Sequence, residues 1–190
     1  MRLPSASKLD LAARCAGSAA LPQIGRLSAA ADAGHSAHAA LEADPQKASA
    51  ILDGLGLSPP EGALVRQEAA FFYDVATGTG RFLGFGRESY GKADPPQKDT
   101  EIGATLDYIA QAKDDALVVD WKAGDARWVP PAFGSYQLGV AALIAERARV
   151  RAAFVFVRDD GEEWADAVLL TEWERDEWED KLRWLAGRVE

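Results

Sequence analysis

The chain has 190 residues, of which 48% are hydrophobic and 27% charged, and these proportions are typical of one globular domain over residues 1–190. Its net charge of −9 excludes a strongly basic protein, although residues 161–190, with 10 acids and 4 bases, hold most of the excess acidity. A single cysteine, Cys15, excludes an internal disulfide. Because no apolar run reaches the roughly 18 residues that cross a bilayer and the N-terminus lacks a signal-peptide pattern, we expect a cytoplasmic protein without a membrane partner.

The first half of the chain indicates two helices and then a strand. A serine-capped helix is predicted over residues 5–15, and an alanine-rich helix over 29–41. Residues 68–75 are predicted to form a strand. The stretch 78–99 holds much of the chain's glycine, proline and lysine, so we expect a loop or an irregular hairpin there.

The second half of the chain alternates strands with helices. Its predicted elements are strands over 101–112 and 116–122, a helix over 131–147, strands over 153–157 and 165–170, and a final helix. This order favours an α/β (α+β) fold in which helices flank a mixed central β-sheet.

The final helix carries two separate stripes of large apolar residues. It begins with Thr171 and Glu174 in the spacing of a capping box. One stripe, predicted to face the core, consists of Trp178, Leu182, Leu185 and Val189. Trp173 and Trp184 share another stripe, about 130° away. They form either a surface for a protein partner or a cover over neighbouring loops, and the sequence leaves both interpretations open.

An acid and a lysine lie close together in the stretch VVDWKAG. Side chains of a strand point to alternate faces, so Asp120 and Lys122 share one face while Trp121 points to the other. The preceding strand carries Asp107. A turn with an even number of residues, centred on the Asp-Asp pair of KDDA, would place Asp107 opposite Lys122 and on the same face as Asp120.

Two carboxylates on one face of a sheet repel each other unless a cation lies between them. Oxygen ligands of this kind suit Mg²⁺ or Mn²⁺, and a neighbouring lysine can orient a water or hydroxide for attack on phosphorus. The alternative is a salt bridge at the strand end between Asp120 and Lys122. The pattern D-x-K does not by itself decide between the two.

The stretch GATLDYIA, followed by VVDWKAG, resembles the active-site hairpin of the PD-(D/E)XK nuclease superfamily, and more closely its RecB-like exonuclease branch. The positions that match the family pattern are the glycine Gly103, the first acid Asp107, the acid–lysine pair Asp120 and Lys122, and the closing glycine Gly124. Ala123 stands where the family usually has threonine.

Other stretches resemble the same branch. AGHSAHAALE matches a motif in which His38 would be a metal ligand, and SYQLGVAALIAE matches a helix motif at Gln137, with Ala141 in place of the expected tyrosine. Glu68 is similar to a family glutamate. The opening segment resembles CRISPR-associated RecB-like nucleases in which a first cysteine holds an iron–sulfur cluster, but Cys15 stands alone, so no cluster is expected.

The resemblance implies a restriction-endonuclease-like core and a Mg²⁺- or Mn²⁺-dependent deoxyribonuclease that acts as an exonuclease on single- or double-stranded DNA ends. The residues expected to hold the metal are His38, Asp107, Asp120 and, through its carbonyl, Trp121. Lys122 would position the attacking water, and Gln137 would contact Lys122 or a phosphate. Further DNA contacts are expected from the cations of residues 81–98.

Two other functions remain open at this stage. One is a CRISPR-adaptation type nuclease that trims DNA ends for a partner. The other is a non-catalytic subunit with a nuclease fold, which would bind DNA ends or a protein through Trp173 and Trp184.

Overall fold

The structure is a computed structural model that describes residues 3–14, 39–123, 129–158 and 161–189. Its strands are β1 (Leu64–Asp74), β2 (Thr79–Phe85), β3 (Glu101–Gln111), β4 (Asp115–Lys122), β5 (Arg149–Val157) and β6 (Glu163–Leu170). Its α-helices are α1 (Ala6–Arg14), α3 (Pro45–Gly54), α4 (Tyr136–Ala145) and α5 (Glu172–Val189), with short 3₁₀ helices η2 (Arg87–Lys92) and η4 (Ala132–Gly134). In these described segments, no helix has the length and apolar character needed to cross a membrane.

The six strands form one mixed sheet in the order β2-β1-β3-β4-β5-β6. All neighbours are antiparallel except β4 and β5, which pair in parallel. A parallel pair requires a crossover, and α4 supplies it. The predicted mixed sheet with flanking helices is therefore confirmed.

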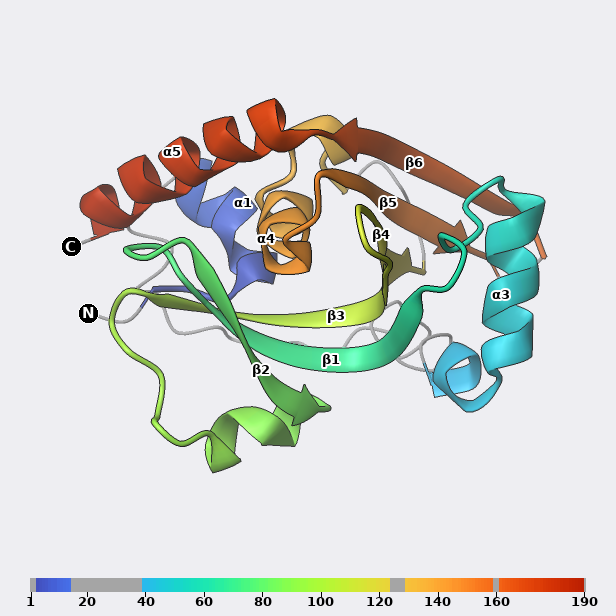
Figure 1. Cartoon of the computed structure of the whole chain (residues 1–190), viewed down its shortest axis with the longest axis horizontal. Helices are drawn as coiled ribbons and strands as arrows, with labels where there is room; N and C mark the ends of the chain where they lie inside the picture. Colours follow the sequence, from blue (N-terminus) through green and yellow to red (C-terminus); the bar gives the residue numbers. More distant parts are fainter. Residues whose placement is uncertain (1–2, 15–38, 124–128, 159–160, 190) are drawn as a thin grey trace.

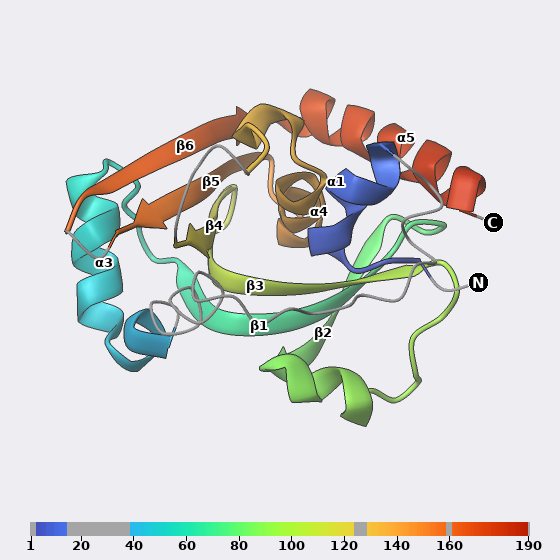
Figure 2. The same ribbon diagram turned by 180° about the vertical axis from the view of Figure 1, so that it is seen from behind.

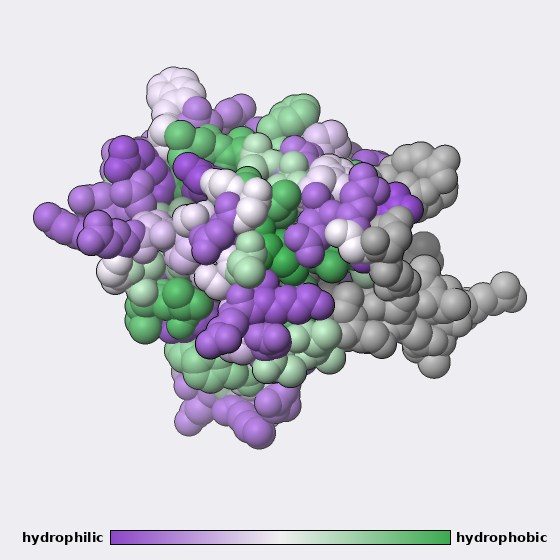
Figure 3. Space-filling view, turned by 90° about the vertical axis from the view of Figure 1, so that its right-hand side faces the viewer, coloured by the Kyte–Doolittle hydropathy of each residue, from purple (hydrophilic) through white to green (hydrophobic). Residues whose placement is uncertain are grey.

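Helices cover the sheet on both faces. Figures 1 and 2 show α1, α4 and α5 gathered over one face and α3 beside the other end of the sheet. The larger core cluster joins α4 and α5 to the sheet, while α3 packs its Ile51 and Leu52 with Val119 and Trp121 of β4. On the side of the molecule shown in Figure 3, hydrophobic residues form several separate groups among hydrophilic ones.

Helix α4 is the most deeply buried element. Every residue from Leu138 to Ala145 is buried, which explains why its sequence is apolar on all sides. The helix packs against α5 at Gly139, where an added Cβ would lie 2.6 Å from a ring carbon of Trp178. The absent side chain of Gly139 therefore permits the close approach of the two helices.

Several predicted boundaries differ from the structure. The predicted helix over 131–147 begins only at Tyr136, because Ser135 is its N-cap and accepts the N–H of Leu138 at 3.4 Å. The stretch 78–99 contains the regular strand β2 and then η2. Residues 29–38 of the predicted helix over 29–41 lie outside the described residues, and the next helix is α3, with Asp44 as N-cap and Pro45 in the first turn.

The final helix is as predicted. The carboxylate of Glu174 accepts the N–H of Thr171 at 2.9 Å, which is half of the capping box. Trp178, Leu182 and Leu185 are at most 4% exposed and face the core, whereas Trp173 and Trp184 are 78% and 55% exposed. The first stripe thus faces the core as predicted, and the indoles of the second stripe are exposed. The side chain of Val189 lies outside the described part of the chain.

Candidate active site

Strands β3 and β4 are paired only near their connecting turn. The ladder runs from Gln111–Ala116 to Tyr108–Val119. The predicted register is therefore wrong by two positions, because the tight turn is formed one residue earlier than expected. A two-residue shift keeps every side chain on its face, so the register places Asp107 level with Asp120 rather than with Lys122.

Where the two strands part, the carboxylate of Asp107 fills the place of a strand partner. Its Oδ2 accepts the backbone N–H of Trp121 at 2.8 Å. From Asp107 back to Glu101, β3 pairs only with β1 in the described part of the chain. The sheet is therefore open at the point where the two acids lie.

Asp120, Lys122 and Gln137 form one connected group. The ammonium of Lys122 makes an ion pair with Oδ2 of Asp120, and Nε2 of Gln137 donates to Oδ1 of the same carboxylate. Nζ of Lys122 also lies 3.4 Å from Oε1 of Gln137 and 5.0 Å from the ring centre of Phe154. An amide can bridge an acid and a lysine in this way because it has both a donor and an acceptor end.

The start of α4 sets the position of Gln137. Asp10 of α1 accepts the backbone N–H of Tyr136 at 3.0 Å and lies 3.3 Å from the hydroxyl of Ser135. An acid at the first turn of a helix satisfies unpaired N–H groups and complements the helix dipole. Asp10 thus joins α1 to the end of α4 that carries the site residue.

The electrostatics at Asp107 disfavour its charged form. Burial raises the pKa of Asp107 well above its ordinary range, and the negative charges of Asp120 and Glu68 raise it further. The N–H of Trp121 and the ammonium of Lys122 act in the opposite direction without cancelling this effect. A buried acid whose pKa is raised by burial and by a neighbouring acid is a feature of sites that carry out chemistry.

Glu68 reaches the site through an irregularity in β1. Its φ of 48° lies in the left-handed region that side chains other than glycine rarely adopt. The β1–β3 register passes from Gln67–Tyr108 to Ala69–Leu106 at this level, so the irregularity falls at Glu68 and Asp107. Strained backbone of this kind persists where the surrounding structure requires it.

A cleft of about 700 Å³ is lined by Asp107, Asp120, Trp121, Lys122 and Gln137. The cleft is also lined by residues from the N-terminal segment and from the connection between β2 and β3: Ser5, Ser7, Lys8, Arg87, Tyr90 and Gln97. Lys8, Tyr90 and Asp10 were missed at the level of sequence. Their spacing carries no signal, since each depends on a contact between distant segments.

Part of the predicted site lies outside the described residues. The structure does not describe the predicted metal ligand His38 or the closing glycine Gly124, nor does it describe Cys15. Within the described segments, no group of three or more His, Cys, Asp or Glu side chains is arranged around a common metal position. Tyr136, the residue before Gln137, packs its ring edge-on against that of Trp178, with 5.2 Å between the ring centres.

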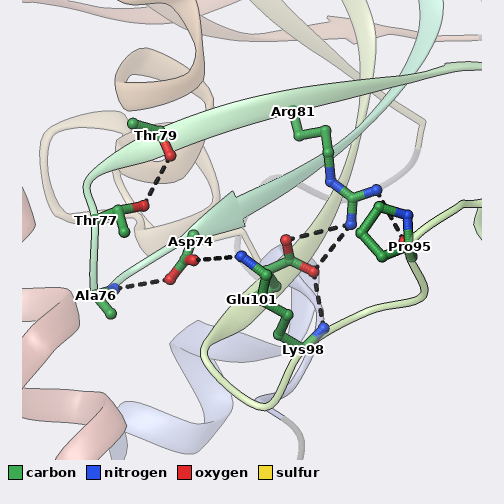
Figure 4. Close-up of polar contacts among 8 residues, drawn as sticks. All are labelled: Asp74, Ala76, Thr77, Thr79, Arg81, Pro95, Lys98 and Glu101. Atoms are coloured by element: carbon green, nitrogen blue, oxygen red, sulfur yellow. Dashed lines mark hydrogen bonds and ion pairs between the residues drawn. The ribbon is translucent and has the colours of Figure 1, made fainter.

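Two of the cations expected to contact DNA are engaged within the protein. Figure 4 shows the guanidinium of Arg81 directed at Glu101, with Nη2 3.3 Å from both carboxylate oxygens. Nζ of Lys98 lies 3.2 Å from Asp74. These pairs link the β2–β3 connection to the strands beside it. Among the cations of residues 81–98, Arg87 lines the cleft, and the DNA contacts of this region stay a prediction.

Comparison with known proteins identifies the family of this chain. A sequence profile described as the PD-(D/E)XK nuclease superfamily matches residues 4–190. The fold is similar to the crystal structure of SSO0001, with 14% identity, 94% of this chain and 68% of that chain covered and a TM-score of 0.39. It is similar also to an alkaline exonuclease (LHK-Exo) from Laribacter hongkongensis, with 12% identity, coverages of 99% and 87% and a TM-score of 0.49. No curated protein matches the sequence. Because the profile spans nearly the whole chain, the protein belongs to the PD-(D/E)XK nuclease superfamily.

Proposed function

We propose that this protein is a Mg²⁺- or Mn²⁺-dependent deoxyribonuclease that shortens DNA from its ends. Membership of the superfamily supports a nuclease whose reaction uses divalent metal. The observation that carries the proposal is the meeting of Asp107, Asp120 and Lys122 in one cleft at the opening between β3 and β4.

The donor set fits a hard divalent cation. Oδ2 of Asp120 is buried and is paired with the ammonium of Lys122, and the neighbouring Asp107 is costly to ionise. A divalent cation between the two carboxylates would offset their mutual repulsion and stabilise the ionised form of Asp107. Asp107, Asp120 and the carbonyl of Trp121 would hold it together with His38, and the metal would supply a water of lowered pKa and neutralise charge on the phosphate.

Lys122 supplies the positive charge that the protein itself contributes to the reaction. Its ammonium would orient the attacking water and offset the charge that develops on the phosphate oxygens. Gln137 bridges Asp120 and Lys122, so it would keep the ammonium aimed at the reacting phosphate. Lys122 thus already lies beside Asp120 before substrate binds.

The test uses end-labelled single-stranded and double-stranded DNA with Mg²⁺ or Mn²⁺. We expect a ladder of shortened products from the parent protein and none from Lys122→Ala. Lys113→Ala is the matched control, because Lys113 is an exposed lysine in the turn of the same hairpin. Full-length DNA with every metal, together with a clear gel shift, would contradict the nuclease proposal and support a non-catalytic binding subunit.

The binding-subunit function has one observation in its favour. Trp173 and Trp184 of α5 expose 78% and 55% of their surface. Exposed indoles of this kind are enriched at contacts between proteins. Capture of a partner by the parent protein but not by a Trp173→Ala/Trp184→Ala variant would support this function, alone or beside the nuclease.

A further inference from the structure

We propose that Tyr90 and Arg87 form a subsite for the unpaired nucleobase of the nucleotide next to the bond that is cut. The inference rests on the proposed nuclease function and deepens it, because it specifies an unpaired strand at the site. Both residues belong to η2, and both line the same cleft as Asp107, Asp120 and Lys122.

The ring of Tyr90 is held in a defined place by three contacts. Its hydroxyl is hydrogen-bonded to that of Thr105 at 2.9 Å, and its ring centre lies 5.4 Å from that of Phe72. Its ring also lies over Gly103, where an added Cβ would be 3.4 Å from a ring carbon. The ring remains only partly buried, and its exposed part borders the cleft. A fixed aromatic surface loses little entropy when a base stacks on it.

The subsite is about one nucleotide away from the acids. Thr105, which holds Tyr90, is two positions before Asp107 on β3, and a strand rises about 3.3 Å per residue. The separation along the strand is therefore about 7 Å. Since β4 does not pair with this part of β3, the cleft continues from the acids towards Tyr90.

Arg87 supplies the charge at this subsite. It is exposed and borders the cleft, and it lies three positions before Tyr90 on the same 3₁₀ helix, where side chains at this spacing lie on one side. Arg81 has a different role, because it is paired with Glu101 and lies 5.1 Å from the ring centre of Phe72. Arg81 therefore packs against Phe72, the other ring of the aromatic pair. Arg87 can instead contact the phosphate backbone of the bound nucleic-acid strand.

The segment that carries the subsite is well anchored. The hydroxyl of Ser89 donates to the carbonyl of Phe85 at 2.8 Å, and the N–H of Gly86 donates to the carbonyl of Glu68 at 2.7 Å. The ion pair between Arg81 and Glu101 closes the other end (Figure 4). This wall of the cleft is therefore preorganised before a strand enters.

The experiment measures binding of a fluorescent single-stranded oligonucleotide and of a fully abasic strand of the same length. Full-length protein with Lys122→Ala is the background, so that no strand is cut. Into it we introduce Tyr90→Ala, Tyr90→Phe and Arg87→Ala. Lys92→Ala is the matched control for charge, because Lys92 lies on the same short helix but not along the cleft.

We expect Tyr90→Ala to weaken binding of the normal strand about tenfold or more and to leave binding of the abasic strand unchanged. Tyr90→Phe keeps the ring and should bind both strands like the background protein. Arg87→Ala should weaken binding of both strands and reduce the salt dependence of binding, whereas Lys92→Ala should do neither.

Equal affinity of Tyr90→Ala and the background protein for the normal strand would overturn the proposal, as would an equal loss on both strands. If Tyr90→Ala does not fold, the background protein provides the test, because equal affinity of that protein for the normal and the abasic strand would also overturn the proposal. Failure of the proposed function is seen separately. Protein with Lys122 intact would then hydrolyse neither DNA nor bis(p-nitrophenyl) phosphate with Mn²⁺, a diester that offers no nucleobase.

Discussion

Replacement of Gly139 by alanine tests how closely α4, the helix that carries Gln137, is held against α5. The added Cβ would lie 2.6, 2.7 and 3.0 Å from three ring carbons of Trp178. Trp178 has little room to move, since it is 4% exposed, its ring meets Tyr136, and Nζ of Lys181 lies 4.4 Å from the ring centre. Either the tryptophan or the whole of α5 must shift.

The magnitude follows from two opposing terms. Alanine in place of glycine within a helix stabilises by about 1 kcal/mol. Overpacking of a well-filled core costs about 1–3 kcal/mol. Gly187→Ala in α5 is the matched control, because nothing lies within 4 Å of its added Cβ and only the first term applies. The free energies of unfolding of the two variants should therefore differ by about 1–3 kcal/mol, with Gly139→Ala the less stable.

Urea unfolding followed by circular dichroism measures both variants beside the parent. We expect Gly187→Ala to raise the midpoint, and Gly139→Ala to lower it or leave it near the parent value, with the slope unchanged in both. In a Trp178→Leu background, the deficit of Gly139→Ala should shrink, since the clashing ring is gone. Equal stabilisation by the two glycine substitutions would show that the helices are not packed as described.

Three further changes have expected outcomes. Asp107→Asn should abolish metal-dependent cleavage. It should also raise the metal-free stability at pH 7, because the raised pKa of Asp107 makes its ionisation costly as the pH rises above about 4. Thermal unfolding from pH 4 to 8 should therefore depend less on pH in the variant than in the parent. Asp10→Ala should lower the free energy of unfolding by about 1 kcal/mol, because the cap of α4 is lost, and should lower kcat more than it raises KM. An unchanged urea midpoint would contradict the capping role. At Asp74, burial raises the pKa, but hydrogen bonds from Thr100, Lys98 and the N–H of Ala76 lower it overall. The contribution of Asp74 to the free energy of unfolding is therefore present above about pH 4 and lost as the pH falls. Urea unfolding should show that Asp74→Asn loses stability at pH 7 but little at pH 2.

Local patterns were sufficient for the elements whose cause lies within a few residues. Alternation along VVDWKAG correctly assigned Asp120 and Trp121 to opposite faces, because the period of a strand is two whatever surrounds it. An even turn kept Asp107 on the face of Asp120 although the register itself was two positions off. The helical period likewise separated the buried Trp178 from the exposed Trp173.

Contacts between distant segments could not be found this way. Asp10 caps a helix that lies 126 positions later in the chain, and Tyr90 reaches the cleft by a hydrogen bond to Thr105 on another strand. The ion pair between Arg81 and Glu101 is a third case, since its two residues lie on different strands. The sequence by itself determined which chemical groups the hairpin presents on one face, because the geometry of the backbone dictates alternation. Only the tertiary structure decided which partners meet those groups, because burial and pairing depend on how the sheet and helices pack together.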